Sequence, residues 1–543
     1  MAKTCIERCV RDHPKCQAIT PYPVGATPLP TRLIDCSDID CLRIVETDPS
    51  MRGTYVALSY VWGEAQPYIT TESTLSRYKM KIDVALPRTI LDAIHVTRTL
   101  GIYLLWIDGL CIVQDSEKDM HHELMRMRDV YRHAYLTIDA SSAANVSEGF
   151  LHDRQLNPEP YATLPFVCPP DDLAKQSADG EQVGMVYVAN RGATYCSSRE
   201  GEKGFCIGNH TASRGWCLQE RLLSTRSLTF TTQTLQLRCH TETHNVGGAD
   251  HDDTFDTPPL PDAVFYPDRH IPHDSDEWMD VSRRWRDIVC DYSRGKLSNP
   301  SDKLIAISAV AEMFAPVLGP DYLAGLWHHS LLQDLLWYAA YRFSHRPPEY
   351  RGPSWSWAST NDYVLWSTHS QEDLLAEVVK CTVTLQNQQL PFGAVTGASL
   401  ILRSSFLPCK CFVRKTKSGI STQRISLDLP FFSSYVLEEP FRCDEDPSLL
   451  EEREVWFVPL LLRCGFFPVG LVGLVVTRAE IDVWRRAGEQ GEGDVYRRVA
   501  VAQYSTAGRT TKRSDANARM IEDQRTQVRD MLSQIPLVDI ELV

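Results

Sequence analysis

Strand and helix patterns alternate between residues 55 and 140, and this alternation limits the fold more than any other part of the sequence. Apolar, β-branched runs over 55–63, 103–112 and 134–140 predict three buried strands. Between them, apolar residues recur at helical spacing over 87–100 and 116–133, which predicts two amphipathic helices. Strand–helix–strand connections are right-handed and place parallel strands in one sheet. The pattern therefore predicts an α/β domain with a doubly wound sheet.

Length and charge exclude several classes of protein. The 543 residues provide for several domains of about 150 residues each. With 56 basic and 70 acidic residues the net charge is −14, which argues against a protein that coats nucleic acid or anionic membrane. The most apolar late stretch, 464–477, contains Pro468 and is shorter than the roughly 20 residues that a membrane span needs. We therefore expect no nucleic-acid partner and no membrane span.

The cysteines and the first residues bear on localisation. Seventeen cysteines are scattered over the chain, whereas disulfide frameworks belong to short secreted proteins. The first nine residues lack the apolar core of a secretory signal. We therefore expect a cytoplasmic protein with reduced thiols.

Composition and periodicity divide the chain into five parts. These are an N-terminal extension (1–54), the α/β domain (55–240), an acidic, proline-rich loop (241–280), a helical region packed on the α/β domain (281–360) and a β-rich C-terminal domain (361–543). The extension is expected to be loosely structured, with one short strand at 42–46. The β-rich part is expected to form a small sandwich or a partly closed barrel.

Asp108 is an unusual residue within an apolar strand pattern. Burying a carboxylate is costly unless it is paired or hydrogen-bonded. At the carboxyl end of a parallel strand it would face the crevice where open α/β sheets bind ligands. The alternative is a side chain that caps the following turn, and the sequence leaves both interpretations open.

The first strand ends with residues suited to a nucleotide or a sugar. Ser59 supplies a hydroxyl, Tyr60 and Trp62 supply aromatic surface, and Gly63 supplies a turn. The alternative is that Trp62 anchors the core and Gly63 is an ordinary turn residue. No second glycine follows at dinucleotide-binding spacing, so the segment is not a dinucleotide fingerprint.

A third candidate lies on a predicted helix near residue 220. Trp216 and Glu220 are four residues apart and so share a helical face, with Gln219 beside them. A glutamate next to an aromatic ring can have a raised pKa and can bind ribose hydroxyls. The alternative is a surface salt bridge between Glu220 and Arg221 or Arg226.

Cysteine and histidine occur together in three short groups that resemble metal-ligand sets. The groups are Cys5, Cys9 and Cys16 with His13; Cys36 with Cys41; and Cys239 with His240 and His244. Their spacings match no familiar zinc finger. The sequence therefore predicts no metal site.

Five motifs occur in an order that resembles a known family. They are Ala57-Leu-Ser-Tyr-Val-Trp-Gly63, Leu86-Pro-Arg-Thr-Ile90, Leu105-Trp-Ile-Asp-Gly-Leu-Cys-Ile-Val-Gln114, Met127-Arg-Asp-Val-Tyr131 and Arg214-Gly-Trp-Cys-Leu-Gln-Glu220. Together, over about 55–221, they resemble the fungal heterokaryon incompatibility (HET) domain. The resemblance implies a cytoplasmic protein of self/non-self recognition, whose HET domain triggers programmed cell death after unlike cells fuse.

The HET family is in turn distantly similar to Toll/interleukin receptor-like (TIR) domains. These are flavodoxin-like α/β domains that self-associate, and some cleave NAD with a glutamate. This analogy implies a flavodoxin/TIR-like fold, NAD as a substrate, no cofactor, and partners that include an incompatibility partner and second copies of the chain. Competing hypotheses are a non-enzymatic protein-interaction module and a pathway-associated regulator without a role in cell death.

The resemblance also indicates which residues carry the function. The catalytic candidates are Glu220, Asp108 and Glu123, the last because the TIR glutamate lies on a comparable helix. The candidate ligand-binding residues are Ser59, Tyr60, Trp62, Gly63, Cys111, Gln114, Trp216 and Gln219.

Overall fold

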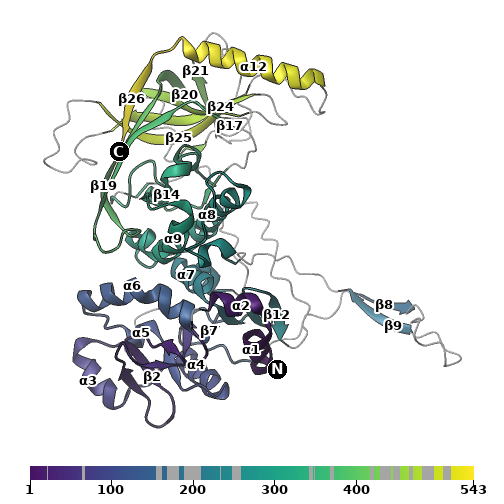
Figure 1. Ribbon diagram of the computed structural model, residues 1–543, viewed down its shortest axis with the longest axis vertical. Coiled ribbons are helices and arrows are strands. Elements are labelled where there is room, and N and C mark those ends of the chain that lie inside the picture. Colours follow the sequence, from purple (N-terminus) through teal and green to yellow (C-terminus); the bar gives the residue numbers. More distant parts are fainter. Residues whose placement is uncertain are drawn as a thin grey trace. The chain divides into compact units, whose positions relative to one another are not determined.

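The computed structural model forms two compact units, residues 1–256 and 257–543 (Figure 1). The structure describes residues 1–20, 22–63, 68–153, 162–167, 183–188, 209–232, 234–246, 259–340, 346–347, 349–366, 372–415, 421–427, 442–443, 453–463, 469–479, 494–505 and 515–543. Each unit is described by itself.

An eight-stranded sheet forms the centre of the N-terminal unit, in the order β12-β11-β10-β7-β5-β6-β2-β3. The strands are β2 (Arg32–Asp35), β3 (Arg43–Glu46), β5 (Val56–Ser59), β6 (Leu104–Trp106), β7 (Leu136–Asp139), β10 (Arg226–Phe230), β11 (Leu235–Cys239) and β12 (Thr243–Val246). The four central strands, β10, β7, β5 and β6, are parallel, and the outer strands are antiparallel. The expected α/β architecture is confirmed, but the sheet is mixed.

Helices connect the parallel strands. The helices of this unit are α1 (Ala2–Asp12), α2 (Pro14–Ile19), α3 (Glu72–Met80), α4 (Arg88–Thr99), α5 (Asp108–Cys111), α6 (Glu117–His133) and α7 (Gly215–Leu223). From β5 the chain passes through α4 to β6 on one side, and then through α6 to β7 on the other side of β5. Because crossover connections are right-handed, this reversal places α4 and α6 on opposite faces of the sheet.

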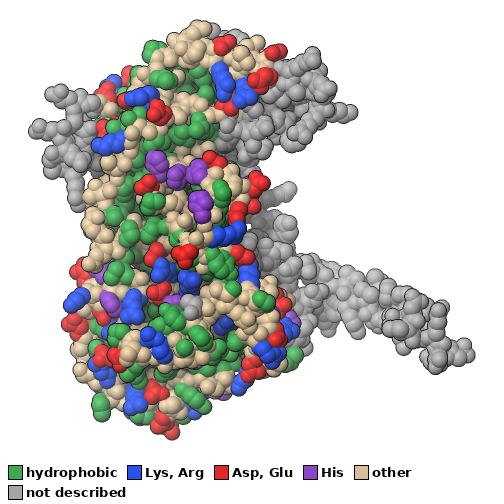
Figure 2. All heavy atoms as spheres, in the orientation of Figure 1, with side chains coloured by type: hydrophobic (Ala, Val, Ile, Leu, Met, Phe, Trp, Pro, Cys, Tyr) green, Lys and Arg blue, Asp and Glu red, His purple; other side chains and the backbone are tan. Residues whose placement is uncertain are grey.

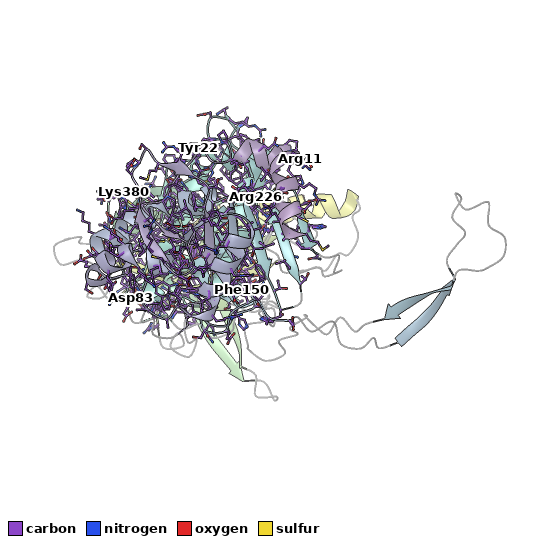
Figure 3. The ribbon with its side chains drawn as sticks, turned by 90° about the horizontal axis from the view of Figure 1, so that it is seen from below. Arg11, Tyr22, Asp83, Phe150, Arg226 and Lys380 are labelled. Carbon is purple, nitrogen blue, oxygen red and sulfur yellow. The ribbon has the colours of Figure 1, made fainter. Side chains whose placement is uncertain are left out.

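Every residue of β5 and β7 is buried, as expected for strands covered on both faces. Beyond β7 the chain packs against the sheet through Phe150, which is labelled in Figure 3. Its ring lies 4.6 Å from that of Phe230 on β10, measured between centroids. These contacts form an apolar core between the sheet and its connections.

Residues 1–54 differ from the expected loose extension. They form α1, α2, β2 and β3, and β2 pairs with β6 in the central sheet, with Ile34 opposite Leu105. Leu33 and Ile34 are fully buried. The prediction of a loosely structured segment is wrong because β2 and β3 have only four residues each. Strands of this length carry little periodic signal, and their pairing is set by distant parts of the chain.

The C-terminal unit combines helices with a second large sheet. The helices are α8 (Asp276–Arg294), α9 (Ile305–Leu318), α10 (Leu331–Asp334) and α12 (Asp515–Ser533). The strands of the sheet are β17 (Glu372–Leu374), β18 (Glu377–Leu385), β19 (Val395–Ser405), β20 (Leu407–Lys415), β21 (Ser421–Leu427), β22 (Arg442–Cys443), β23 (Val455–Arg463), β24 (Gly470–Arg478), β25 (Val495–Ser505) and β26 (Leu537–Leu542). The expected β-rich C-terminal region is confirmed.

The main path of this sheet runs β18-β19-β26-β25-β24-β23-β20-β21, with β17 on β23 and β22 on β25. Its described strands thus belong to one hydrogen-bonded sheet and not to the two separate sheets of a sandwich. Five tryptophans of this unit are fully buried: Trp285, Trp327, Trp337, Trp355 and Trp357.

Shorter elements complete the two units. Two-residue to six-residue strands form the pairs β1 (Thr27–Pro28) with β4 (Arg52–Gly53), β8 (Ala162–Val167) with β9 (Val183–Val188), β13 (Tyr322–Leu323) with β14 (Leu326–Trp327), and β15 (Tyr338–Ala339) with β16 (Val364–Leu365).

Figure 2 shows acidic and basic side chains interspersed over the described parts of the visible face. None of the helices in the described residues has both the length and the apolar character needed to cross a membrane.

Candidate functional site

Functional groups from four elements meet at the carboxyl ends of the parallel strands. Ser59 and Asp139 end β5 and β7, and Asp108 follows β6 as the first residue of α5. Glu220 lies on α7, which leads from β7 to β10. The chain connections reverse direction between β5 and β7, and open α/β sheets bind ligands at such switch points.

Asp108 is held by hydrogen bonds to both of its carboxylate oxygens. Trp62 Nε1 donates to Oδ2 over 2.7 Å, and the backbone N–H of Gly109 donates to Oδ1 over 2.7 Å. Burial raises the pKa of Asp108, and the Arg214 guanidinium and the Trp62 hydrogen bond oppose this effect. The side chain remains partly exposed. Asp108 therefore satisfies the first turn of its own helix and also orients Trp62.

Glu220 is almost completely buried, with 5 % of its surface exposed. Burial, and next the negative charge of Asp108, raise its pKa to about 7, while a hydrogen bond from the Ser59 hydroxyl and the charge of Arg214 lower it. In the described part of the chain, Oε2 accepts no hydrogen bond. The alternative of a surface salt bridge is wrong because the side chain is inside the protein. Glu220 is therefore a carboxyl group that titrates near neutral pH.

Arg214 supplies a positive charge to this pair of carboxyl groups. Its Nη1 donates to the carbonyl oxygen of Tyr60 over 2.8 Å, which fixes the guanidinium beside the end of β5. The charges of Cys217, Glu220 and Asp108 raise the pKa of Arg214, although burial, the largest single effect, opposes them. Sequence reasoning did not select Arg214 as a site residue, although it opens the motif that ends in Glu220.

Aromatic side chains surround Asp108 closely. A Cβ on Gly109 would lie 3.1 Å from Tyr60 Oη, 3.7 Å from Tyr68 Cε2 and 3.8 Å from Trp62 Cζ2. Gly109 therefore allows these rings to approach the start of α5. Burial, with the charge of Asp108, raises the pKa of Tyr60 well above its ordinary value, so its hydroxyl stays protonated.

Tyr131 and Asp139 also lie close to Glu220, and neither was selected from the sequence. The Tyr131 hydroxyl donates to the carbonyl of Leu58 over 3.2 Å and lies beside Glu220. Asp139 accepts a hydrogen bond of 2.7 Å from Thr211, and its charge adds to the raised pKa of Glu220. Tyr131 belongs to the predicted helix at 116–133 and Asp139 to the predicted strand at 134–140. Both elements end near the predicted site, and this position is the signal that could have identified the two residues.

Three predicted residues have other surroundings. Glu123 is buried and lies 3.7 Å from Arg32 Nη2 and 3.1 Å from His122 Nδ1, measured from its Oε1. Cys111 is fully buried, and burial raises its pKa to about 12. Gln114 donates to the backbone carbonyls of Asp108 and Ile112 over 3.0 and 3.1 Å. Glu123 therefore contacts charged and ring-nitrogen groups of its own surroundings, Cys111 is packed in the core, and Gln114 supports the backbone of α5.

The remaining predicted residues lie around the same strand end and helix. Gly63 has a φ of +78°, and a Cβ there would lie 2.8 Å from Asn145 Cβ, so the turn requires glycine. Gln219 is buried on α7, whereas Trp216 is partly exposed on the same helix. Trp62, Asp108, Gln114, Arg214 and Trp216 are partly exposed, and Gly63 is exposed. Solvent therefore reaches these residues, whereas Ser59, Tyr60, Gln219 and Glu220 are buried.

Residues 55–220 match the family model described as heterokaryon incompatibility protein (HET). The chain carries a HET domain. A similar protein is the heterokaryon incompatibility protein 6, OR allele, of Neurospora crassa, which is 30 % identical over 121 residues. The alignment covers 20 % of this chain and 18 % of that protein, so the chain matches less than a fifth of its relative's length. No solved structure matches this chain.

The HET match contains the candidate site but not the whole sheet. Ser59, Trp62, Asp108 and Glu220 all lie within 55–220. Of the eight strands that the structure describes in this sheet, five lie outside the matched residues: β2, β3, β10, β11 and β12. The HET domain of this protein is therefore built on a sheet completed by residues on both sides of it.

Proposed function

We propose that this protein acts in heterokaryon incompatibility, with its HET domain triggering programmed cell death by cleaving NAD between nicotinamide and ribose. The observation that carries the proposal is the pair Asp108 and Glu220. Two carboxyl groups from different elements interact at the carboxyl ends of parallel strands, and one has its pKa raised to about 7. Pairs of carboxyl groups with separated pKa values are typical of enzymes that break glycosidic bonds.

The topology supports a nucleotide ligand. The parallel strands in spatial order β6-β5-β7-β10 follow the chain order second, first, third, fourth, which is also the order of doubly wound flavodoxin-like sheets. Such sheets bind nucleotides between the first and third strands, here β5 and β7. Trp62 and Trp216 are partly exposed near this point and provide surfaces on which a ring can stack.

The chemistry can be written for these residues. The bond between ribose C1′ and the nicotinamide nitrogen breaks, and both electrons leave with nicotinamide, which departs neutral. The ribosyl group then carries positive charge, which the carboxylate of Asp108 stabilises. A water oxygen bonds to C1′ and its proton passes to Glu220 in its ionised form, and from there to solvent. The products are ADP-ribose, nicotinamide and one proton.

The test is nicotinamide release from NAD by the purified full chain, with a crowding agent present to promote self-association. We expect Asp108→Asn and Glu220→Gln each to reduce the rate by about 100-fold or more, because each removes a charge or proton acceptor at the reacting centre. Glu117→Gln is the matched control, since Glu117 is exposed on α6. Release that continues unchanged in both site variants would contradict the assignment.

Expression in fungal cells separates the two parts of the proposal. Growth arrest without nicotinamide release would favour a HET domain that acts by binding protein partners, including an incompatibility partner or second copies of itself. Normal growth of cells that overproduce the chain would contradict a death trigger. It would favour a regulator of another pathway.

A further inference from the structure

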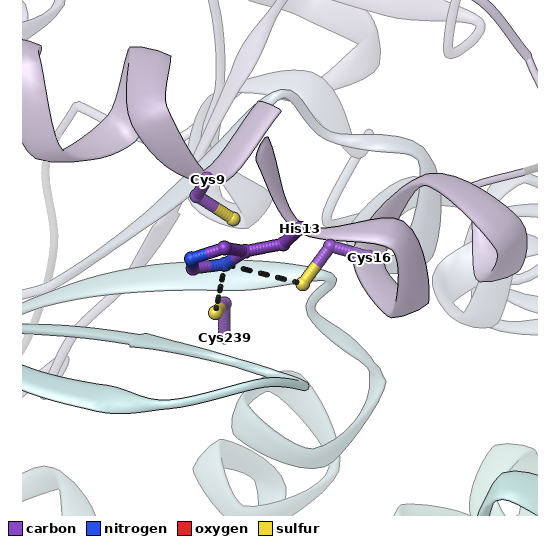
Figure 4. Close-up of side chains that lie close together, drawn as sticks. All are labelled: Cys9, His13, Cys16 and Cys239. Carbon is purple, nitrogen blue, oxygen red and sulfur yellow. Dashed lines mark hydrogen bonds between the residues drawn. The ribbon is translucent and has the colours of Figure 1, made fainter. Parts of the chain in front are cut away.

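Three cysteines and one histidine from distant parts of the chain converge in the N-terminal unit (Figure 4). Cys9 lies on α1, His13 lies between α1 and α2, Cys16 lies on α2, and Cys239 ends β11. Their Sγ atoms and a ring nitrogen all lie within 4.8 Å of one another. His13 Nδ1 is 3.4 Å from Cys239 Sγ and 4.0 Å from Cys16 Sγ.

We propose that Cys9, His13, Cys16 and Cys239 form a structural zinc site. Three thiolates and one imidazole are an established ligand set for structural zinc. With bonds of about 2.0 to 2.3 Å, tetrahedral zinc ligands lie about 3.3 to 3.8 Å apart. The four side chains approach this spacing already. Cys9 and Cys16 are fully buried and Cys239 is 7 % exposed, so the site is closed, as structural zinc sites are.

The surroundings of His13 support this assignment. Its Nδ1 faces the sulfur atoms, and its Nε2 lies 3.5 Å from Glu242 Oε1. Arg8 holds the same Glu242 oxygen at 2.8 Å. A carboxylate on the second ring nitrogen is the common way to orient a zinc-binding histidine. The Thr241 hydroxyl, 3.3 Å from Cys16 Sγ, adds a contact of the same kind to a sulfur.

Three sulfur atoms within 4.8 Å of one another cannot all ionise without a positive charge among them. A divalent cation would allow all three cysteines to ionise, because it supplies the positive charge directly.

The site would join segments that sequence analysis treated separately. It connects the short helices α1 and α2 to β11, and Cys239 lies 226 residues after His13. Helices of 11 and 6 residues are marginal alone. The sequence placed Cys9, His13 and Cys16 in one group and Cys239 in another, and neither group alone contains four ligands in this arrangement. All four residues lie outside the HET match. The metal would therefore link the segment that precedes residue 55 to the segment that follows residue 220.

The test uses the full chain, purified with reductant and without a histidine tag. We expect one zinc per chain by elemental analysis, and replacement with Co²⁺ should produce the absorption of tetrahedral thiolate-bound cobalt. Cys16→Ser and Cys239→Ser should lose the metal, whereas Cys5→Ser, on the same helix as Cys9 but outside the cluster, should retain it. Removing the metal with a chelator should lower the thermal midpoint, and adding zinc should restore it.

Two results would overturn the proposal. One is a parent protein with reduced cysteines that takes up neither zinc nor Co²⁺. The other is a disulfide between two of the three cysteines in the protein as isolated from cells, detected by mass spectrometry without added reductant. If the serine variants fail to fold, the zinc content, the cobalt spectrum and the chelation cycle of the parent decide the question by themselves.

Discussion

Glu220→Gln is expected to stabilise the protein relative to the parent as pH rises from 5 to 8. Burial raises the pKa of Glu220 from its ordinary value of 4.5 to about 7. Between these two values the folded protein holds a proton that the unfolded chain releases, so the stability of the parent falls as pH rises through this window. A pKa difference of about 2.5 corresponds to about 3 kcal/mol in the free energy of unfolding. This contribution is fully lost above pH 7. Glutamine has no proton to lose, and the variant should escape this loss.

The measurement is the free energy of unfolding of the full chain in urea at pH 5, 6, 7 and 8. The difference between variant and parent should change in favour of the variant by up to about 3 kcal/mol across this series. Comparing pH values within each protein removes the constant effect of exchanging a carboxyl for an amide. Glu117→Gln, which changes the same chemical group at an exposed position of α6, is the control. Parallel pH profiles for parent and Glu220→Gln would show that the buried carboxyl is not protonated in the folded state.

Arg498→Met is expected to destabilise the C-terminal unit by about 3 to 5 kcal/mol. Arg498 lies on β25 and is completely buried. Its guanidinium donates to the carbonyls of Leu335, over 2.6 Å, and Trp337, and lies 3.6 Å from the centre of the Trp337 ring. The backbone N–H of Arg498 donates to Ser354 Oγ over 3.0 Å. Methionine fills similar volume but leaves two buried carbonyls without this donor.

Arg403→Met is the matched control for this prediction. Arg403 lies on β19 of the same sheet and pairs with Asp539 at 2.8 Å, but the two side chains are 43 % and 48 % exposed. Exposed pairs contribute about 1 kcal/mol or less, so this variant should unfold close to the parent. Urea unfolding followed by tryptophan fluorescence measures both variants. If the two variants lose the same free energy of unfolding, burial of the Arg498 contacts adds no stability.

The candidate site was only partly accessible to sequence reasoning. Ser59, Trp62 and Asp108 were selected because they interrupt or end apolar strand patterns, and such ends meet at one edge of a parallel sheet. Sequence could not decide between a buried and a surface-paired Glu220, because that depends on what packs against α7. Arg214 was missed for the same reason. Its role depends on the carbonyl of Tyr60, which only the fold brings within 2.8 Å.

Local patterns in the sequence determined the central strands β5, β6 and β7 and the helices α4 and α6, because each carries its own apolar period. They also indicated the HET match over residues 55–220, through motifs whose order is visible along the chain. Only the tertiary structure decided that residues 1–54 complete the sheet, that Glu123 pairs with Arg32, and that Cys239 joins Cys9, His13 and Cys16. These features depend on contacts between residues tens to hundreds of positions apart. Such contacts leave no periodic trace in either segment, because they arise only when the whole chain packs.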